Sequence, residues 1–127
     1  MPLKVNVNAK SAGCFTVSPV GSIDTGTSMI LEKEIDSLLK KKPKAIVLDM
    51  QGVEFMSSAG VRVVFKTKRC IEEAGGVLTI VNLKPQIKKV FDIINALPSL
   101  QIFESIEELD KYLAEMQKKS VEEGESS

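Results

Sequence analysis

The sequence predicts an α/β domain in which a mixed sheet of four to five strands packs against about four helices. Strand-like and helix-like segments alternate in the order β-β-α-β-α-β-α-β-α, and such alternation is typical of α/β folds. Two continuous apolar runs, residues 45–49 and 77–81, are typical of strands buried on both faces of a sheet. The length of 127 residues suits one domain. We expect a sheet that is parallel through its centre and antiparallel at its N-terminal edge.

The antiparallel edge is predicted from two segments, residues 3–9 and 14–20. The first alternates apolar and polar residues, and the second is rich in Phe, Thr and Val. The three residues between them, 11–13, are few enough for a hairpin. Pro19 lies late in the second segment, which indicates an edge strand or the end of a strand, because proline lacks a backbone N–H.

Helices are predicted where apolar residues recur at helical spacing. In the first, residues 28–40, Ile30 widens the apolar stripe and Thr27 or Ser28 can cap the N-terminus. Lysines followed by Pro43 end it. The next two helices are expected over residues 58–74 and 85–97.

The C-terminal part of the chain offers weaker signals. Residues 102–103 form a very short apolar pair, and residues 105–108 match a capping box that opens a final helix. From residue 118 onwards one residue in ten is apolar, too few to offset the entropy lost on ordering. We therefore expect a folded domain over residues 1–117 and a disordered tail over residues 118–127.

The composition excludes several classes of function. Lys plus Arg and Asp plus Glu number 17 each, so no net charge draws the chain to nucleic acid or anionic lipid. Histidine is absent, which excludes Ser-His-Asp and Cys-His catalysis and HExxH zinc sites. The two cysteines, Cys14 and Cys70, form no metal motif and are expected to be buried and reduced. Without an apolar run of about 18 residues, we expect a cytoplasmic domain that needs no cofactor, metal or membrane insertion.

The segment with the most functional information is FMSSAG, residues 55–60, which links the turn expected over residues 50–56 to the helix that follows. Ser57 and Ser58 fall at the N-cap or in the first turn of the helix predicted over residues 58–74. A phosphate there would face the positive end of the helix dipole, although a serine at this position is most often a simple cap. A serine nucleophile is disfavoured, because GxSxG and P-loop motifs are absent as well as histidine.

Two further features could belong to the same surface. Asp24 lies in the loop 21–27, between a predicted strand and a predicted helix, and the two serines also lie between a strand and a helix. Asp is, however, also common in ordinary turns. The helix over residues 58–74 carries charged residues beginning beside Ser58, which fit either a solvated face or a contact with an acidic partner. Three of its cations, Arg62, Lys66 and Arg69, recur at positions i, i+4 and i+7 of one helix face, and we call them the basic stripe.

The order of elements and four sequence segments resemble the STAS domain family, and bacterial anti-sigma factor antagonists in particular. These segments are GSID at residues 21–24, VLDMQGVEF at 47–55, MSSAG at 56–60 and NLKP at 82–85. The resemblance covers residues 3–115 and implies a single STAS-type domain.

The resemblance implies a regulatory module, not an enzyme, that sequesters an anti-sigma factor serine kinase and is switched off by phosphorylation, which a phosphatase reverses. Ser58 occupies the position of the phosphorylated hydroxyl, two residues before Gly60, and Asp24 matches the family's loop aspartate on the partner-binding face. Partner binding is expected at Asp24, Ser57, Ser58, Gly60 and the basic stripe.

One departure from the family pattern leaves an alternative open. Ser57 stands where the pattern has Asp, and it is also the second candidate for the phosphorylated residue. STAS domains also serve as non-phosphorylated scaffolds in stress-signalling or transporter-associated complexes, and the missing acid favours that alternative.

Overall fold

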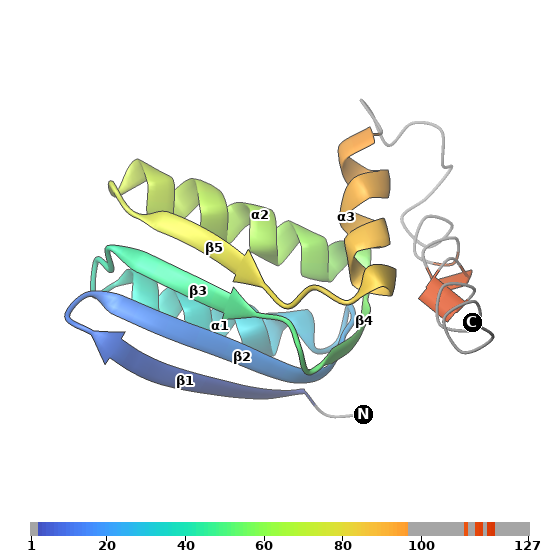
Figure 1. Cartoon of the computed structure of the whole chain (residues 1–127), viewed down its shortest axis with the longest axis horizontal. Helices are drawn as coiled ribbons and strands as arrows, with labels where there is room; N and C mark the ends of the chain where they lie inside the picture. Colours follow the sequence, from blue (N-terminus) through green and yellow to red (C-terminus); the bar gives the residue numbers. More distant parts are fainter. Residues whose placement is uncertain (1–2, 97–110, 112–113, 116, 119–127) are drawn as a thin grey trace.

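The computed structural model describes residues 3–96, 111, 114–115 and 117–118 (Figure 1). In this part of the chain a mixed five-stranded sheet is accompanied by three helices, which confirms the predicted α/β class. The strands are β1 (Lys4–Ser11), β2 (Cys14–Ile23), β3 (Ala45–Asp49), β4 (Val53–Met56) and β5 (Val77–Val81), and the helices are α1 (Ser28–Leu39), α2 (Ser58–Glu73) and α3 (Pro85–Ala96).

The sheet has the strand order β1-β2-β3-β5, and β4 pairs with β2 outside this path. The hairpin β1–β2 is antiparallel, and its turn uses Gly13 at a φ of 79°, a conformation that glycine adopts without steric cost. All other pairs, β2–β3, β2–β4 and β3–β5, are parallel. The predicted parallel centre and antiparallel N-terminal edge are therefore confirmed.

Strand β2 pairs in parallel with two different strands along its length. Its first half, from Cys14 to Val17, pairs with β3, and its end, from Gly21 to Ile23, pairs with β4. Pro19 lies between these two ladders, in the interior of a central strand. The prediction of an edge or strand end at Pro19 was therefore wrong. Proline is tolerated here because neither parallel partner is paired with β2 at this position.

Two strand predictions need correction. The residues expected to form only a turn, 50–56, contain β4, whose four residues are too few to show a period and which forms through its pairing with β2. Strand β5 was expected to be buried on both faces, but Val77 is 55% exposed. In the described sheet β5 is the last strand beside β3, so it is only partly covered.

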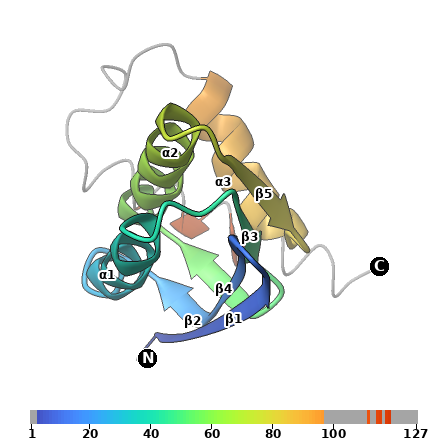
Figure 2. The same cartoon turned by 90° about the vertical axis from the view of Figure 1, so that its left-hand side faces the viewer.

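The core lies between the sheet and α1 and α2, which lie on the same face of the sheet (Figure 2). Ile30 does not widen the buried stripe of α1 as predicted, because it is 43% exposed and its neighbour Met29 is 72% exposed. Helix α3 packs against α2 through an edge-to-face contact of the Phe65 and Phe91 rings, with centroids 6.0 Å apart. The largest fully buried side chains are Val17, Ile23, Leu31, Ile35, Ile46, Leu48, Met50, Met56, Ile71 and Ile87.

Several sequence expectations concern residues outside the described part. The apolar pair 102–103 and the start of the final helix at residues 105–108 lie there, whereas residues 111, 114–115 and 117–118 are helical. Cys14 and Cys70 are free and half-buried, so their expected full burial was wrong. Within the described ranges, no helix combines the length and apolar composition needed to cross a membrane.

Removing residues 119–127 should leave the domain folded and equally stable. This segment contains one apolar side chain, Val121, and surface changes typically alter the free energy of unfolding by no more than about 0.5 kcal/mol. The melting temperature, followed by circular dichroism, should stay within about 3 °C of the full chain. A fall of ten degrees or more would show that this segment docks on the domain.

Candidate functional site

The two serines singled out from the sequence lie where β4 passes into α2. Ser57 is the N-cap residue, with an extended backbone (φ −94°, ψ 176°), and Ser58 is the first residue of α2. The first backbone bond of the helix runs from the Val61 N–H to the Ser57 carbonyl, at 3.1 Å. The predicted position at the N-cap and first turn is confirmed. We call this pair the serine turn.

The two residues of the serine turn differ in exposure, although both hydroxyl oxygens are covered. Ser57 is only 3% exposed, and its Oγ has no hydrogen-bond partner among the described residues. It therefore does not act as the side-chain cap that its position suggests. Ser58 is half-buried, although its Oγ is covered. Ser58 is thus the more accessible residue of the two.

Asp24 organises the loop that leads from β2 into α1. Its Oδ1 accepts hydrogen bonds from the backbone N–H groups of Gly26 and Thr27, both at 2.9 Å. The Asp24 N–H donates to Thr27 Oγ1 at 2.9 Å, and this hydroxyl lies 2.7 Å from the Ser22 carbonyl oxygen. Hydrogen bonds made by the side chains of Asp24 and Thr27 therefore hold residues 24–27 together, and we call these residues the Asp24 loop.

This network also explains why the predicted cap of α1 is absent. Thr27 occupies the N-cap position but makes no side-chain cap bond, because its hydroxyl points back into the loop. Ser28 does not cap the helix either, since its hydroxyl donates to the Thr25 carbonyl at 3.4 Å. The expectation that either residue caps α1 was wrong.

The electrostatics of the Asp24 loop favour an ionised carboxylate. The hydrogen bond from the Thr27 N–H has the largest effect and lowers the pKa of Asp24 below its ordinary value. Burial acts in the opposite direction, and the Thr27 hydroxyl and the Gly26 N–H lower the pKa further. Asp24 therefore carries a full negative charge at neutral pH.

The pairing of β2 with β4 brings the Asp24 loop and the serine turn together. Ile23 and Met56, the last residues of the two strands, are in register. One residue further on, the Ser57 N–H donates to the Ile23 carbonyl at 2.8 Å. Asp24 and the serine turn thus follow adjacent, hydrogen-bonded residues at the same end of the sheet, as the sequence suggested.

Gly60 is required by this close approach. It is buried in the first turn of α2, and a Cβ atom there would lie 2.7 Å from Ile23 Cγ2 and 3.2 Å from the Ile23 carbonyl oxygen. Ile23 is fully buried and has little room to move. Gly60 therefore lets α2 begin directly against β2, and it offers no exposed side chain for a partner.

The basic stripe is interrupted at its centre. Lys66 is half-buried, and its Nζ lies 3.5 Å from Glu32 and 3.8 Å from Asp36, both on α1. Arg62 and Arg69 are exposed. Lys66 therefore links the two helices, and the exposed part of the stripe consists of the two arginines.

One contact at the site was not found from the sequence. Gln117 is 3% exposed, its Nε2 donates to the Met56 carbonyl at 2.8 Å, and its Oε1 accepts from the Met56 N–H at 2.9 Å. A single glutamine in a polar segment carries no sequence signal for such a contact.

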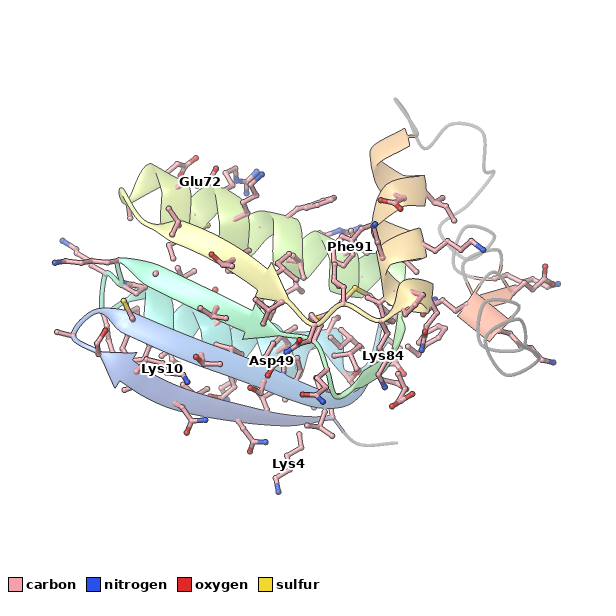
Figure 3. All side chains as sticks on the ribbon, viewed as in Figure 1. Lys4, Lys10, Asp49, Glu72, Lys84 and Phe91 are labelled. Atoms are coloured by element: carbon pink, nitrogen blue, oxygen red, sulfur yellow. The ribbon has the colours of Figure 1, made fainter. Side chains whose placement is uncertain are left out.

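Other polar contacts join the segment after β5 to Asp49, the last residue of β3, and to Glu54 in β4. The Asn82 side chain, on a residue with a φ of 58°, donates to Asp49 at 3.0 Å, and Lys84 pairs with Glu54. Asp49 and Lys84 are labelled at this end of the sheet in Figure 3. Within the described residues, no three Cys, Asp or Glu side chains gather to hold a metal ion.

The amino-acid sequence matches the model of a known protein family. The family model described as STAS domain matches residues 7–109. The chain belongs to the STAS domain family. Its membership confirms the resemblance seen in the sequence.

Relatives of this STAS domain carry a common name. BtrV of Bordetella bronchiseptica, named as an anti-sigma factor antagonist, is 32% identical over 73 residues, which span 58% of this chain and 63% of BtrV. The anti-sigma F factor antagonist of Paenibacillus polymyxa is 22% identical over 73% of this chain and 80% of its own length. The crystal structure of an anti-sigma factor antagonist from Mycobacterium paratuberculosis aligns with a TM-score of 0.66 at 25% identity, covering 78% of this chain and 88% of that one.

The substitution Gly60→Ala should destabilise the STAS domain by about 1–3 kcal/mol, because the added methyl group overpacks the fully buried Ile23. Gly26→Ala is the matched control, since a Cβ at this exposed glycine would meet only Asp24 Oδ1 at 3.5 Å. Urea unfolding measures both variants. Equal stability of the two would contradict the close approach of α2 to β2.

Asp24 should contribute stability that disappears in acid. Because folding lowers its pKa below 3.8, this contribution is complete above that value and is lost as the pH falls through the lower pKa of the folded state. Asp24→Asn keeps an acceptor but cannot titrate. The difference in urea midpoint between the original chain and this variant should therefore shrink between pH 6 and pH 2. A difference that stays constant would contradict the hydrogen bonds assigned to the ionised Asp24.

Proposed function

We propose that this chain is an anti-sigma factor antagonist, a binding module of the bacterial cytoplasm that sequesters an anti-sigma factor kinase. The observation that carries the proposal is the hydrogen-bonded juxtaposition of the Asp24 loop and the serine turn at the ends of β2 and β4. Family membership and the shared name of the relatives support the same conclusion. In this proposal the chain itself has no catalytic role, and the partner kinase binds and uses ATP.

The surroundings of these two loops suit a protein partner. Met29 and Ile30 are exposed apolar side chains at the start of α1, directly after the Asp24 loop. Arg62 and Arg69 are exposed on α2, which begins at the serine turn. Apolar side chains flanked by charges of both signs are typical of protein–protein interfaces.

Phosphorylation of Ser58 would switch this surface off. A phosphate adds a charge of about −1.5 to −2 at pH 7. The first turn of α2 has backbone N–H groups that helix bonds do not use, and Arg62 lies four residues after Ser58, so the folded domain tolerates the phosphate. At an interface, however, the same dianion, at the end of the sheet that also carries the Asp24 carboxylate, would repel an acidic partner and resist desolvation. A phosphatase would then restore binding.

A second candidate function is that of a non-phosphorylated STAS scaffold in a stress-signalling or transporter-associated complex. Two observations favour it. Ser57 replaces the acid of the family pattern, and the Ser58 Oγ is covered. In this alternative the same two loops bind a partner without a covalent switch.

Ser58 variants separate the two functions. We expect a kinase-like anti-sigma factor from the same genome to bind the unmodified chain and to phosphorylate it with ATP. Ser58→Ala should abolish phosphorylation and keep binding, whereas Ser58→Asp should weaken binding by about tenfold or more, equivalent to about 1.4 kcal/mol. Ser57→Ala is the matched control, and it should remain a substrate. Calorimetry and phosphopeptide mapping measure these outcomes.

Each alternative outcome has a definite meaning. Phosphate on Ser57 alone would overturn the assignment of Ser58. Tight binding without phosphate on either serine would favour the scaffold. Absence of binding by the unmodified chain to that anti-sigma factor would contradict the proposed partner.

A further inference from the structure

The amide of Gln117 completes the hydrogen bonding of the last residue of β4. Its Oε1 and Nε2 contact the N–H and carbonyl of one residue, Met56, at 2.9 and 2.8 Å. A side-chain amide carries one acceptor and two donors, so it can replace a neighbouring strand at a single ladder position. The contact is buried at both ends, since Gln117 is 3% exposed and Met56 is not exposed at all.

The contact of Gln117 lies at Met56, directly before the serine turn. Strand β4 pairs with β2 along one edge. Buried backbone groups without partners are costly, and the Gln117 amide removes this cost at Met56. The next residue along the chain is Ser57, whose N–H bonds to the Ile23 carbonyl. The chain entering the serine turn is therefore held by Gln117 at Met56 and by β2 at Ser57.

We infer that Gln117 is a positioning residue for the serine turn and that it couples the C-terminal helical segment to the partner-binding surface. The functional part of this inference rests on the proposed function, whereas the positioning itself is a property of the isolated chain. Gln117 acts through the backbone of Met56.

Amide hydrogen exchange of the full-length chain, followed by NMR, tests the positioning. Gln117→Met keeps the length and the apolar stem of the side chain but removes the two hydrogen bonds to Met56. We expect exchange of the Met56 amide to accelerate tenfold or more and that of Ser57 to accelerate with it, while Leu48 in β3 stays unchanged. Glu115→Gln is the matched control, because Glu115 is helical and exposed in the same segment, and no change is expected.

The variant Gln117→Glu tests the same contact through its pH dependence. At neutral pH its second carboxylate oxygen would face the Met56 carbonyl oxygen, and the two repel. Burial and this repulsion raise the pKa of the new carboxyl. Once protonated, it offers the donor and acceptor of the original amide. Protection at Met56, corrected for the intrinsic pH dependence of exchange, should therefore be low at pH 7 and recover at pH 4–5.

The binding assay of the preceding section tests the functional coupling. Gln117→Met should weaken binding of the anti-sigma factor about tenfold, and Glu115→Gln should not. Unchanged Met56 exchange in Gln117→Met, or equal acceleration at Leu48, would overturn the positioning role. Local acceleration with unchanged affinity would overturn the coupling and leave the proposed function intact. If the unmodified chain did not bind at all, the proposed function and the coupling would fail together, while exchange still decided the positioning role.

Discussion

The functional surface depends on one constraint, the parallel pairing of the end of β2 with the short strand β4. Because β2 pairs first with β3 and then with β4, its last residue lies in register with Met56. The hydrogen bond from the Ser57 N–H to the Ile23 carbonyl extends this pairing beyond the strands. Helices α1 and α2 follow these two strand ends, so they begin side by side. Without β4, the Asp24 loop and the serine turn would have no fixed relation.

The packing beneath this surface keeps the two loops in place. Gly60 allows α2 to begin against Ile23, and Lys66 joins α2 to two carboxylates of α1. Asp24 binds the N–H groups of its own loop, so the loop has a defined shape before any partner arrives. A pre-formed binding surface loses less entropy on association than a flexible one. The fold thus supplies a rigid support for the proposed binding surface.

Much of this arrangement was predictable from the sequence, and the remainder depends on contacts distant in the chain. Periodicity identified α1, α2 and α3, and the apolar runs identified β3 and β5. Strand β4 was missed, because four residues form a strand only when β2 is beside them. The position of the serine turn was predictable from the resemblance and from its place before a helix. The contact of Gln117 with Met56 spans 61 positions, and no local pattern indicates it.

The most direct test of the central claim is an NMR titration of the isotopically labelled chain with the unlabelled anti-sigma factor. If the Asp24 loop and the serine turn form one surface, amide shifts should change together at residues 24–30 and 57–62. The far end of the β1–β2 hairpin, around Lys10 (Figure 3), should remain unaffected. Changes confined to one of the two loops, or centred on β1, would contradict the claim.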